Sequence, residues 1–157
     1  MGVEAVIDGL NVYRAVEACG ERVMSHWAAT SDHPQMREGF GVIATREANH
    51  ARALASRIVD LGGATAPTCV DDALAEFVSE AEKPMSDGER LRLFNSFLSG
   101  AGERGDVLTT CMGGIRTAME QGDPETKAML QAIFVDEKLS MDWCSEQGAT
   151  ARSTPPS

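Results

Sequence analysis

The chain has 157 residues, a formal net charge of -10 and a sequence pI near 4.7. This length suits one domain with one core, and the negative charge argues against a surface that tracks nucleic-acid phosphates. The composition is 43% hydrophobic but only 5% aromatic, and because Ala, Leu and Met pack well in helices, it favours an all-α protein.

The first expected helix runs from about residue 3 to residue 30, and its apolar stripe includes one acid. The stripe repeats at steps of three and four residues, which is the pattern of one face of an amphipathic helix. Its members are Val6, Leu10, Tyr13, Glu17, Gly20, Met24 and Trp27. Glu17 therefore stands where a hydrophobic side chain is expected.

The second expected helix covers residues 34–61 and carries two polar residues on its apolar stripe. Ser31 and Asp32 are expected to cap it, and Pro34 suits its first turn, so the connection is short and the two helices are antiparallel. The stripe consists of Met36, Phe40, Ile43, Glu47, His50, Leu54 and Leu61. Burying an acid such as Glu47 is costly unless a cation or several donors compensate it, so we expect a partner in the core.

The second half of the chain predicts another hairpin after a long crossover. Residues 64–103 contain two shorter helical segments, at 71–82 and after the capping-box pattern SDGE at 86–89. Helices follow at 105–121 and 124–146, separated by a Gly-Asp-Pro turn. The stripe of the last helix is Leu130, Phe134, Glu137, Met141 and Cys144. We expect one domain over residues 1–147 and a disordered tail over 148–157.

Three inward acids are expected at one level of this bundle. In an antiparallel hairpin, residues equidistant from the turn lie at the same height, and positions 17 and 47 are equidistant from residue 32. Glu137 lies about as far beyond the second turn, at about 1.5 Å of rise per residue. Glu17, Glu47 and Glu137 should therefore converge, with His50 one turn from Glu47.

This arrangement resembles the ferritin-like superfamily, which includes ferritins, bacterioferritins and rubrerythrins. The segment REANHARALASRIVDLGG, residues 46–63, is similar to the first Glu-x-x-His helix of that family, and DEKLSMDW, residues 136–143, is similar to the second. The resemblance implies a four-helix bundle in which such helices bind two irons. It also implies that Glu17, Glu47, His50 and Glu137 are metal ligands.

Two ligands of the family pattern are absent from this chain. Ser140 stands where the second histidine is expected, and Leu108 stands near the level at which the third helix should offer a glutamate. Asp106 is the nearest acid and lies to one side of the stripe, while Cys111 suits core packing better than a ligand role. The carboxylates and imidazole that remain favour iron, manganese or zinc, as one ion or two.

Two functional hypotheses stay open at this stage. The first is a metal-binding protein for which the resemblance implies oxygen- or peroxide-linked oxidase activity, as a non-haem iron oxidoreductase. The second is a non-catalytic scaffold or interaction module that has lost the di-metal site. The thiols are expected to be reduced, because the four cysteines form no C-x-x-C pair.

The chain is expected to be cytoplasmic, with metal ions as its partners and neither nucleic acid nor membrane. No apolar run approaches the roughly 18 residues that a membrane span needs, and MGVEAVIDGL lacks the basic region of a signal peptide. We also expect a homodimer or a higher homo-oligomer.

Overall fold

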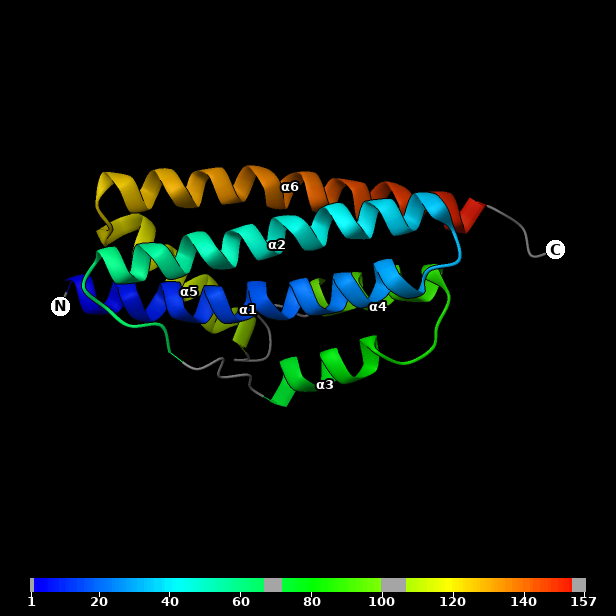
Figure 1. Cartoon of the computed structure of the whole chain (residues 1–157), viewed down its shortest axis with the longest axis horizontal. Coiled ribbons are helices and arrows are strands. Elements are labelled where there is room, and N and C mark those ends of the chain that lie inside the picture. The colour runs from blue at the N-terminus through cyan, green and yellow to red at the C-terminus, as the bar shows by residue number, and fades with distance from the viewer. Residues whose placement is uncertain (1, 67–71, 100–106, 154–157) are drawn as a thin grey trace.

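The structure is a computed structural model that describes residues 2–66, 72–99 and 107–153, and each regular element within these ranges is a helix. The expected all-α class is therefore confirmed (Figure 1). In chain order the helices are α1 (Gly2–Thr30), α2 (Pro34–Asp60), α3 (Asp72–Ala81), α4 (Asp87–Ser99), α5 (Val107–Gln121) and α6 (Pro124–Ser153).

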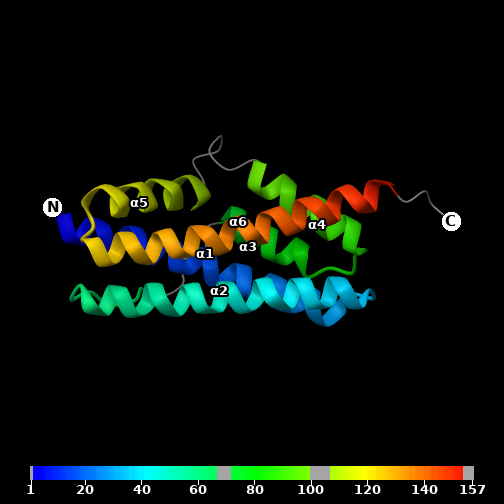
Figure 2. The same cartoon turned by 90° about the horizontal axis from the view of Figure 1, so that it is seen from above.

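Three long helices and two short ones make up the bundle. The helices α1, α2 and α6 run along the length of the molecule, with α1 packed against both α2 and α5. Figure 2 shows α5 along the half nearer the N-terminus and α4 along the half nearer the C-terminus, both beside α6. The expected pair of hairpins is thus confirmed, but two short helices share one side of the bundle. Helix α3 packs on the outside of α1.

The expected cap of the second helix is wrong. His33 is the N-cap residue of α2, and no side chain makes a cap hydrogen bond there. Ser31 is buried, and its hydroxyl donates to Oδ2 of Asp87 at 2.6 Å while it accepts a hydrogen bond from the His33 amide at 3.3 Å. The serine is therefore used to tie the first hairpin to α4.

The last helix is longer than the sequence pattern predicts. It continues to Ser153, beyond the expected end at residue 146. The physical reason is local propensity, because Glu146, Gln147 and Ala149 all favour helix and the first proline comes only at Pro155. The domain boundary at residue 147 stays a prediction, and residues 154–157 of the expected tail lie outside the described residues.

Two hydrophobic clusters fill the bundle, one towards each end. The cluster nearer the N-terminus includes Leu10, Leu54 and Ile133, and the other includes Trp27 and Phe40. The expected stripe of α6 is partly wrong. Met141 has 50% of its surface exposed, and its neighbour Ser140 is buried in the face that turns inward. Between the two clusters lies the layer in which the sequence placed its acids.

The backbones of α1 and α5 touch where two glycines meet. A Cβ atom on Gly9 would lie 2.6 Å from the carbonyl oxygen of Gly114, and one on Gly114 would lie 2.6 Å from the Cα of Gly9. Only residues without side chains permit this approach. The contact places α5 tightly on the N-terminal half of α1.

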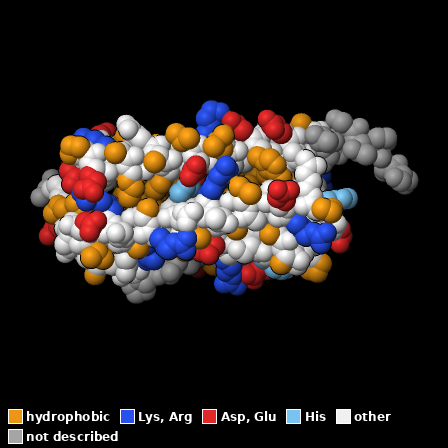
Figure 3. Space-filling model, turned by 45° about the horizontal axis from the view of Figure 1, so that its top comes forward, with side chains coloured by type: hydrophobic (Ala, Val, Ile, Leu, Met, Phe, Trp, Pro, Cys, Tyr) orange, Lys and Arg blue, Asp and Glu red, His pale blue; other side chains and the backbone are white. Residues whose placement is uncertain are grey.

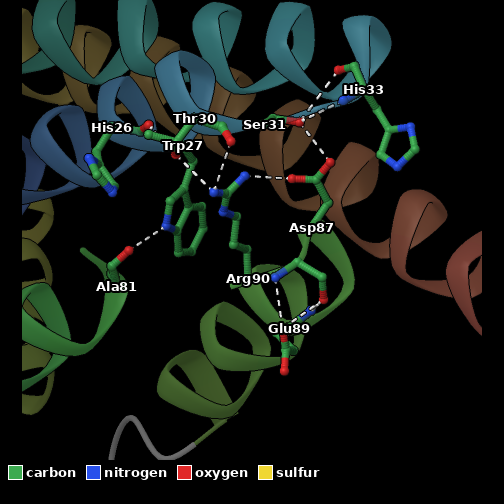
Figure 4. A network of polar contacts seen from close by, with 10 residues as sticks. His26, Trp27, Thr30, Ser31, His33, Ala81, Asp87, Glu89 and Arg90 are labelled. Carbon is green, nitrogen blue, oxygen red and sulfur yellow. Dashed lines mark hydrogen bonds and ion pairs between the residues drawn. The ribbon is translucent and has the colours of Figure 1, made fainter. Parts of the chain in front are cut away.

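Buried arginines join the helices at the two ends of the bundle. At one end the Arg57 guanidinium donates to Thr126 Oγ1 at 2.9 Å and to the carboxylates of Asp123 and Glu125, which ties α2 to the turn before α6. At the other end, Arg90 of α4 donates to Oδ1 of Asp87 at 2.6 Å and to Oγ1 of Thr30 at 2.8 Å (Figure 4).

The same end of the molecule shows how the crossover is attached. The indole Nε1 of Trp27 donates to the carbonyl of Ala81 at 2.8 Å, which docks the end of α3 on α1 (Figure 4). The capping box expected at the start of α4 is confirmed, since the Ser86 amide donates to Glu89 Oε2 at 2.7 Å and the Glu89 amide donates to Ser86 Oγ at 3.4 Å.

Candidate metal centre

Three of the four predicted ligand residues meet in the layer between the two hydrophobic clusters. Glu17 of α1, His50 of α2 and Glu137 of α6 each offer an oxygen or nitrogen atom, and these atoms lie within 4.8 Å of one another. The Nδ1 atom of His50 is 3.0 Å from Oε2 of Glu17 and 3.1 Å from Oε1 of Glu137. Of the three acids expected to converge, Glu17 and Glu137 meet here, together with His50.

The other ring nitrogen of His50 has its own carboxylate partner. Its Nε2 atom lies 3.2 Å from Oδ2 of Asp136, a residue that half-faces solvent on α6. A histidine that binds a metal through one nitrogen commonly donates its other N–H to a carboxylate, which fixes the ring orientation. The Asp136 contact leaves Nδ1 directed at Glu17 and Glu137.

Asp136 was missed by the sequence reasoning. The stripe pattern assigns inward positions at steps of three and four, and Asp136 lies one residue before the expected ligand Glu137, off that stripe. Neighbouring residues on a helix point about 100° apart, so Asp136 can face α2 while Glu137 faces the centre. The sequence contained one indication of this contact, because a second acid, Asp136, directly precedes the expected ligand Glu137.

One buried oxygen of this group has no hydrogen-bond partner among the described residues. It is Oε1 of Glu137. Although it lies 3.1 Å from Nδ1 of His50, that nitrogen carries at most one hydrogen, and Oε2 of Glu17 accepts it. Because an unpaired buried carboxylate oxygen is costly, this atom indicates a site for a cation.

The fourth predicted residue, Glu47, lies beside this group and outside the set of three. Its carboxyl group lies where a Cβ atom of Gly20 on α1 would be and interacts with the carboxyl group of Glu17. Burial, followed by repulsion from Glu17 and Glu137, raises the pKa of Glu47 to about 11. The raised pKa favours the protonated form of Glu47, whose carboxyl group then donates a hydrogen bond to Glu17.

The pKa values of Glu17 and His50 are also raised. Burial is the main cause for Glu17, opposed by its hydrogen bond with His50. Burial alone would lower the pKa of His50, but the carboxylates of Glu137, Glu17 and Asp136 outweigh it and raise the pKa to about 10. Without a metal ion, a protonated His50 is thus the cation that offsets the acids around it.

The residues near the centre that are not ligands keep their protons. Burial and the charges of Glu17 and Glu137 raise the pKa of the Cys111 thiol to about 12, and burial together with Glu47 does the same for Cys144. The pKa of Tyr13 is raised as well, mainly by burial. Within the part of the chain that the structure describes, Cys111 does not join the group of close ligand atoms.

The positions of the two missing family ligands hold other side chains. Leu108 is buried at the start of α5. Ser140 is buried on α6, and its hydroxyl accepts a hydrogen bond from Nη1 of Arg46 at 3.1 Å. Asp106 lies outside the described residues. The donors that surround the centre therefore come from α1, α2 and α6.

The outer surface over α6 and α2 mixes charged and hydrophobic side chains along its length (Figure 3). Val42 of α2 and Val135 and Leu139 of α6 are exposed hydrophobic residues. None of the helices in the described ranges is both long enough and apolar enough to cross a membrane.

Comparison with known proteins identifies one family. A family model described as a ferritin-like domain matches residues 22–153. This range includes Glu47, His50 and Glu137, whereas Glu17 precedes it. Neither the curated proteins nor the solved structures contain a significant match to the chain.

Proposed function

The chain belongs to the ferritin-like family, and from that premise we propose that it binds an iron-class cation between Glu17, His50 and Glu137. The observation that carries this proposal is the buried Oε1 atom of Glu137, which lacks a hydrogen-bond partner in the described part of the chain and faces the other two donors. Two carboxylates and one imidazole are ligands that suit iron, manganese or zinc.

The neighbouring residues support binding in two ways. Asp136 accepts a hydrogen bond from Nε2 of His50, so Nδ1 is free to coordinate once it loses its proton. Glu47 supplies a further carboxyl group, hydrogen-bonded to Glu17, that becomes a ligand when a cation displaces its proton.

An iron ion held here would supply one-electron chemistry towards oxygen or peroxide, which is the basis for proposing an oxidase activity. The protein's own contribution is to bind and orient. His50 is held by Asp136, and the two hydrophobic clusters exclude water from above and below the layer. Buried Leu108 and the Ser140–Arg46 contact make the donor set unequal, so we propose one tightly bound ion and at most one weaker ion.

A second function, a non-catalytic scaffold, is supported by the His50 contacts. Both ring nitrogens lie against carboxylates, so a protonated His50 can join α1, α2 and α6 without a metal. In that case the acids have a structural role. A cytoplasmic location and assembly into a homo-oligomer stay predictions from the sequence.

Elemental analysis separates the two functions. Protein purified from iron-supplemented cells is expected to contain one or two ions per chain, and the variants Glu137→Gln and His50→Gln are expected to contain almost none while retaining their helical circular dichroism. A parent protein without metal, purified from cells in which a known iron protein is loaded, would reject the proposed function and favour the scaffold.

A further inference from the structure

Gly20 lies one helical turn after Glu17 on α1 and faces the Glu47 carboxyl group of α2. A Cβ atom on Gly20 would lie 2.6 Å from Oε2 of Glu47 and 3.1 Å from its Cδ. Carbon and oxygen atoms that are not bonded rarely approach within 3 Å, so Glu47 uses space that any side chain at position 20 would fill. The lack of a side chain at position 20 leaves the space in which the Glu47 carboxyl group lies.

The other glycines of the bundle serve different purposes. The space beside Gly9 is filled by the backbone of Gly114, which is a packing contact between helices. Gly41, which is half-buried like Gly20 and lies within α2, has no atom within 4 Å of its Cβ position. Of these three helical glycines, only Gly20 has a carboxyl group in the place of its Cβ.

We propose that Gly20 is a positioning residue of the metal centre, because it gives the Glu47 carboxyl group its place beside Glu17, His50 and Glu137. Glu47 lies too far to one side to belong to the set of three close ligand atoms, yet it is hydrogen-bonded to Glu17. A methyl group at position 20 would push Glu47 out of this place and break its contact with Glu17. The inference rests on the proposed function, since it assigns Glu47 a share of the metal affinity.

Manganese(II) binding tests the proposed role of Gly20, with the free ion measured by electron paramagnetic resonance. Gly20→Ala is expected to weaken binding by about 10- to 100-fold, the loss typical of groups that support metal ligands. Glu47→Ala should weaken binding by a similar factor, and adding Gly20→Ala to Glu47→Ala should cause no further loss. The matched control Gly41→Ala is expected to bind like the parent.

Two results would overturn the inference. One is parent-like binding by Gly20→Ala. The other is an equal loss from Gly20→Ala with and without Glu47, since the glycine would then act through some other contact. Non-additivity with Glu47 is the readout that a merely structural glycine would not produce.

Melting temperatures of the metal-free proteins test the geometry even if no ion binds. Alanine favours helix over glycine, so Gly20→Ala should raise the melting temperature in the Glu47→Ala background, as Gly41→Ala should in the parent. With Glu47 present, Gly20→Ala should raise it less, because the Glu47 carboxyl group must shift away from the added methyl group. An equal rise in both backgrounds would overturn the inference, whereas absence of manganese binding by the parent would reject the proposed function alone.

Discussion

Two of the buried polar clusters in the described part of the chain differ in charge balance. At the end of the bundle, Arg90 and Asp87 form an ion pair in which both side chains are almost fully buried, with further hydrogen bonds to Thr30 and Ser31. In the central layer, three carboxyl groups contact one imidazole and a fourth, that of Glu47, lies beside Glu17. An oxygen of Glu137 there has no hydrogen-bond partner among the described residues.

The difference shows how a structural cluster is distinguished from a candidate binding site. In the Arg90–Asp87 pair the two opposite charges offset each other, so the pair needs no ion from outside, even though Nε of Arg90 has no hydrogen-bond partner among the described residues. A cluster with excess acid must keep extra protons or bind a cation. The pKa values of Glu17, Glu47 and His50 are raised, which favours the protonated forms of these groups in the metal-free centre.

The largest expected effect comes from breaking the balanced cluster. Arg90→Met leaves the buried Asp87 carboxylate without its cation, and we expect a loss of about 3–5 kcal/mol in the free energy of unfolding. Urea denaturation should give the same loss with and without a chelator, because the cluster is remote from the metal ligands. As a control, removing the exposed Arg22–Glu82 pair should cost at most about 1 kcal/mol.

Removing metal should affect the central cluster alone. A protein with free metal at a hundred times the dissociation constant is stabilised by about 2.7 kcal/mol, and a chelator should abolish this gain. Calorimetry of the parent and of Arg90→Met should show equal downward shifts after chelation. If a chelator that strips the metal leaves the melting temperature unchanged, the central acids are satisfied without an ion.

Replacing an acid in the central cluster should raise the free energy of unfolding, whereas Arg90→Met lowers it. Glu47→Leu places a hydrophobic side chain on the stripe between Ile43 and Leu54, and we expect the metal-free protein to gain about 1 kcal/mol of stability. The same variant should bind metal more weakly. Chemical denaturation in chelator measures the first effect, and a less stable metal-free variant would show that the Glu47–Glu17 hydrogen bond outweighs the burial cost.

The last expected effect is a pH dependence that comes from the central cluster. The pKa of His50 is raised from its ordinary value of 6.5 to about 10, so its contribution to stability is complete below pH 6.5 and is lost as the pH rises towards 10. Glu47 acts in the same direction between its ordinary pKa of 4.5 and about 11, since folding disfavours its charged form. The metal-free protein should therefore be less stable at pH 9 than at pH 6.

Denaturation of the chelated protein at several pH values measures this effect. Glu47→Leu should have a shallower pH dependence than the parent, because one of the two groups is gone. Metal affinity should change in the opposite direction and increase with pH, since binding must displace these protons. A metal-free parent that is equally stable at pH 6 and pH 9 would contradict the assigned charge states.

Much of this fold could be predicted from the sequence, because helical stripes and turn residues specify it locally. The positions of Glu17 and His50 follow from the stripes of α1 and α2 and from the short turn between them. The contact between Asp136 and His50 could not be predicted, since it depends on the rotation of α6 relative to α2. The same uncertainty in rotation explains why Met141 was expected inside, although half of its surface is exposed.

The placement of the Glu47 carboxyl group beside Gly20 could not be predicted from the sequence either. The sequence puts Gly20 on the stripe of α1 but does not reveal that a carboxyl group, and not a hydrophobic side chain, fills its space. The helix that extends to Ser153 was missed because Gly148, a residue type that often ends helices, follows the expected boundary, whereas the observed helix continues through it.

The contact between Gly9 and Gly114 has a consequence for the order in which the protein folds. Helix α5 contains two consecutive glycines, Gly113 and Gly114, and each costs about 1 kcal/mol of helix stability relative to alanine. An isolated α5 would therefore be largely unfolded, and docking on α1 is what makes it helical. We expect α1 and α2 to fold first, with Glu17 and His50 already paired. Hydrogen exchange should then show α5 opening as a separate unit while the first hairpin stays protected.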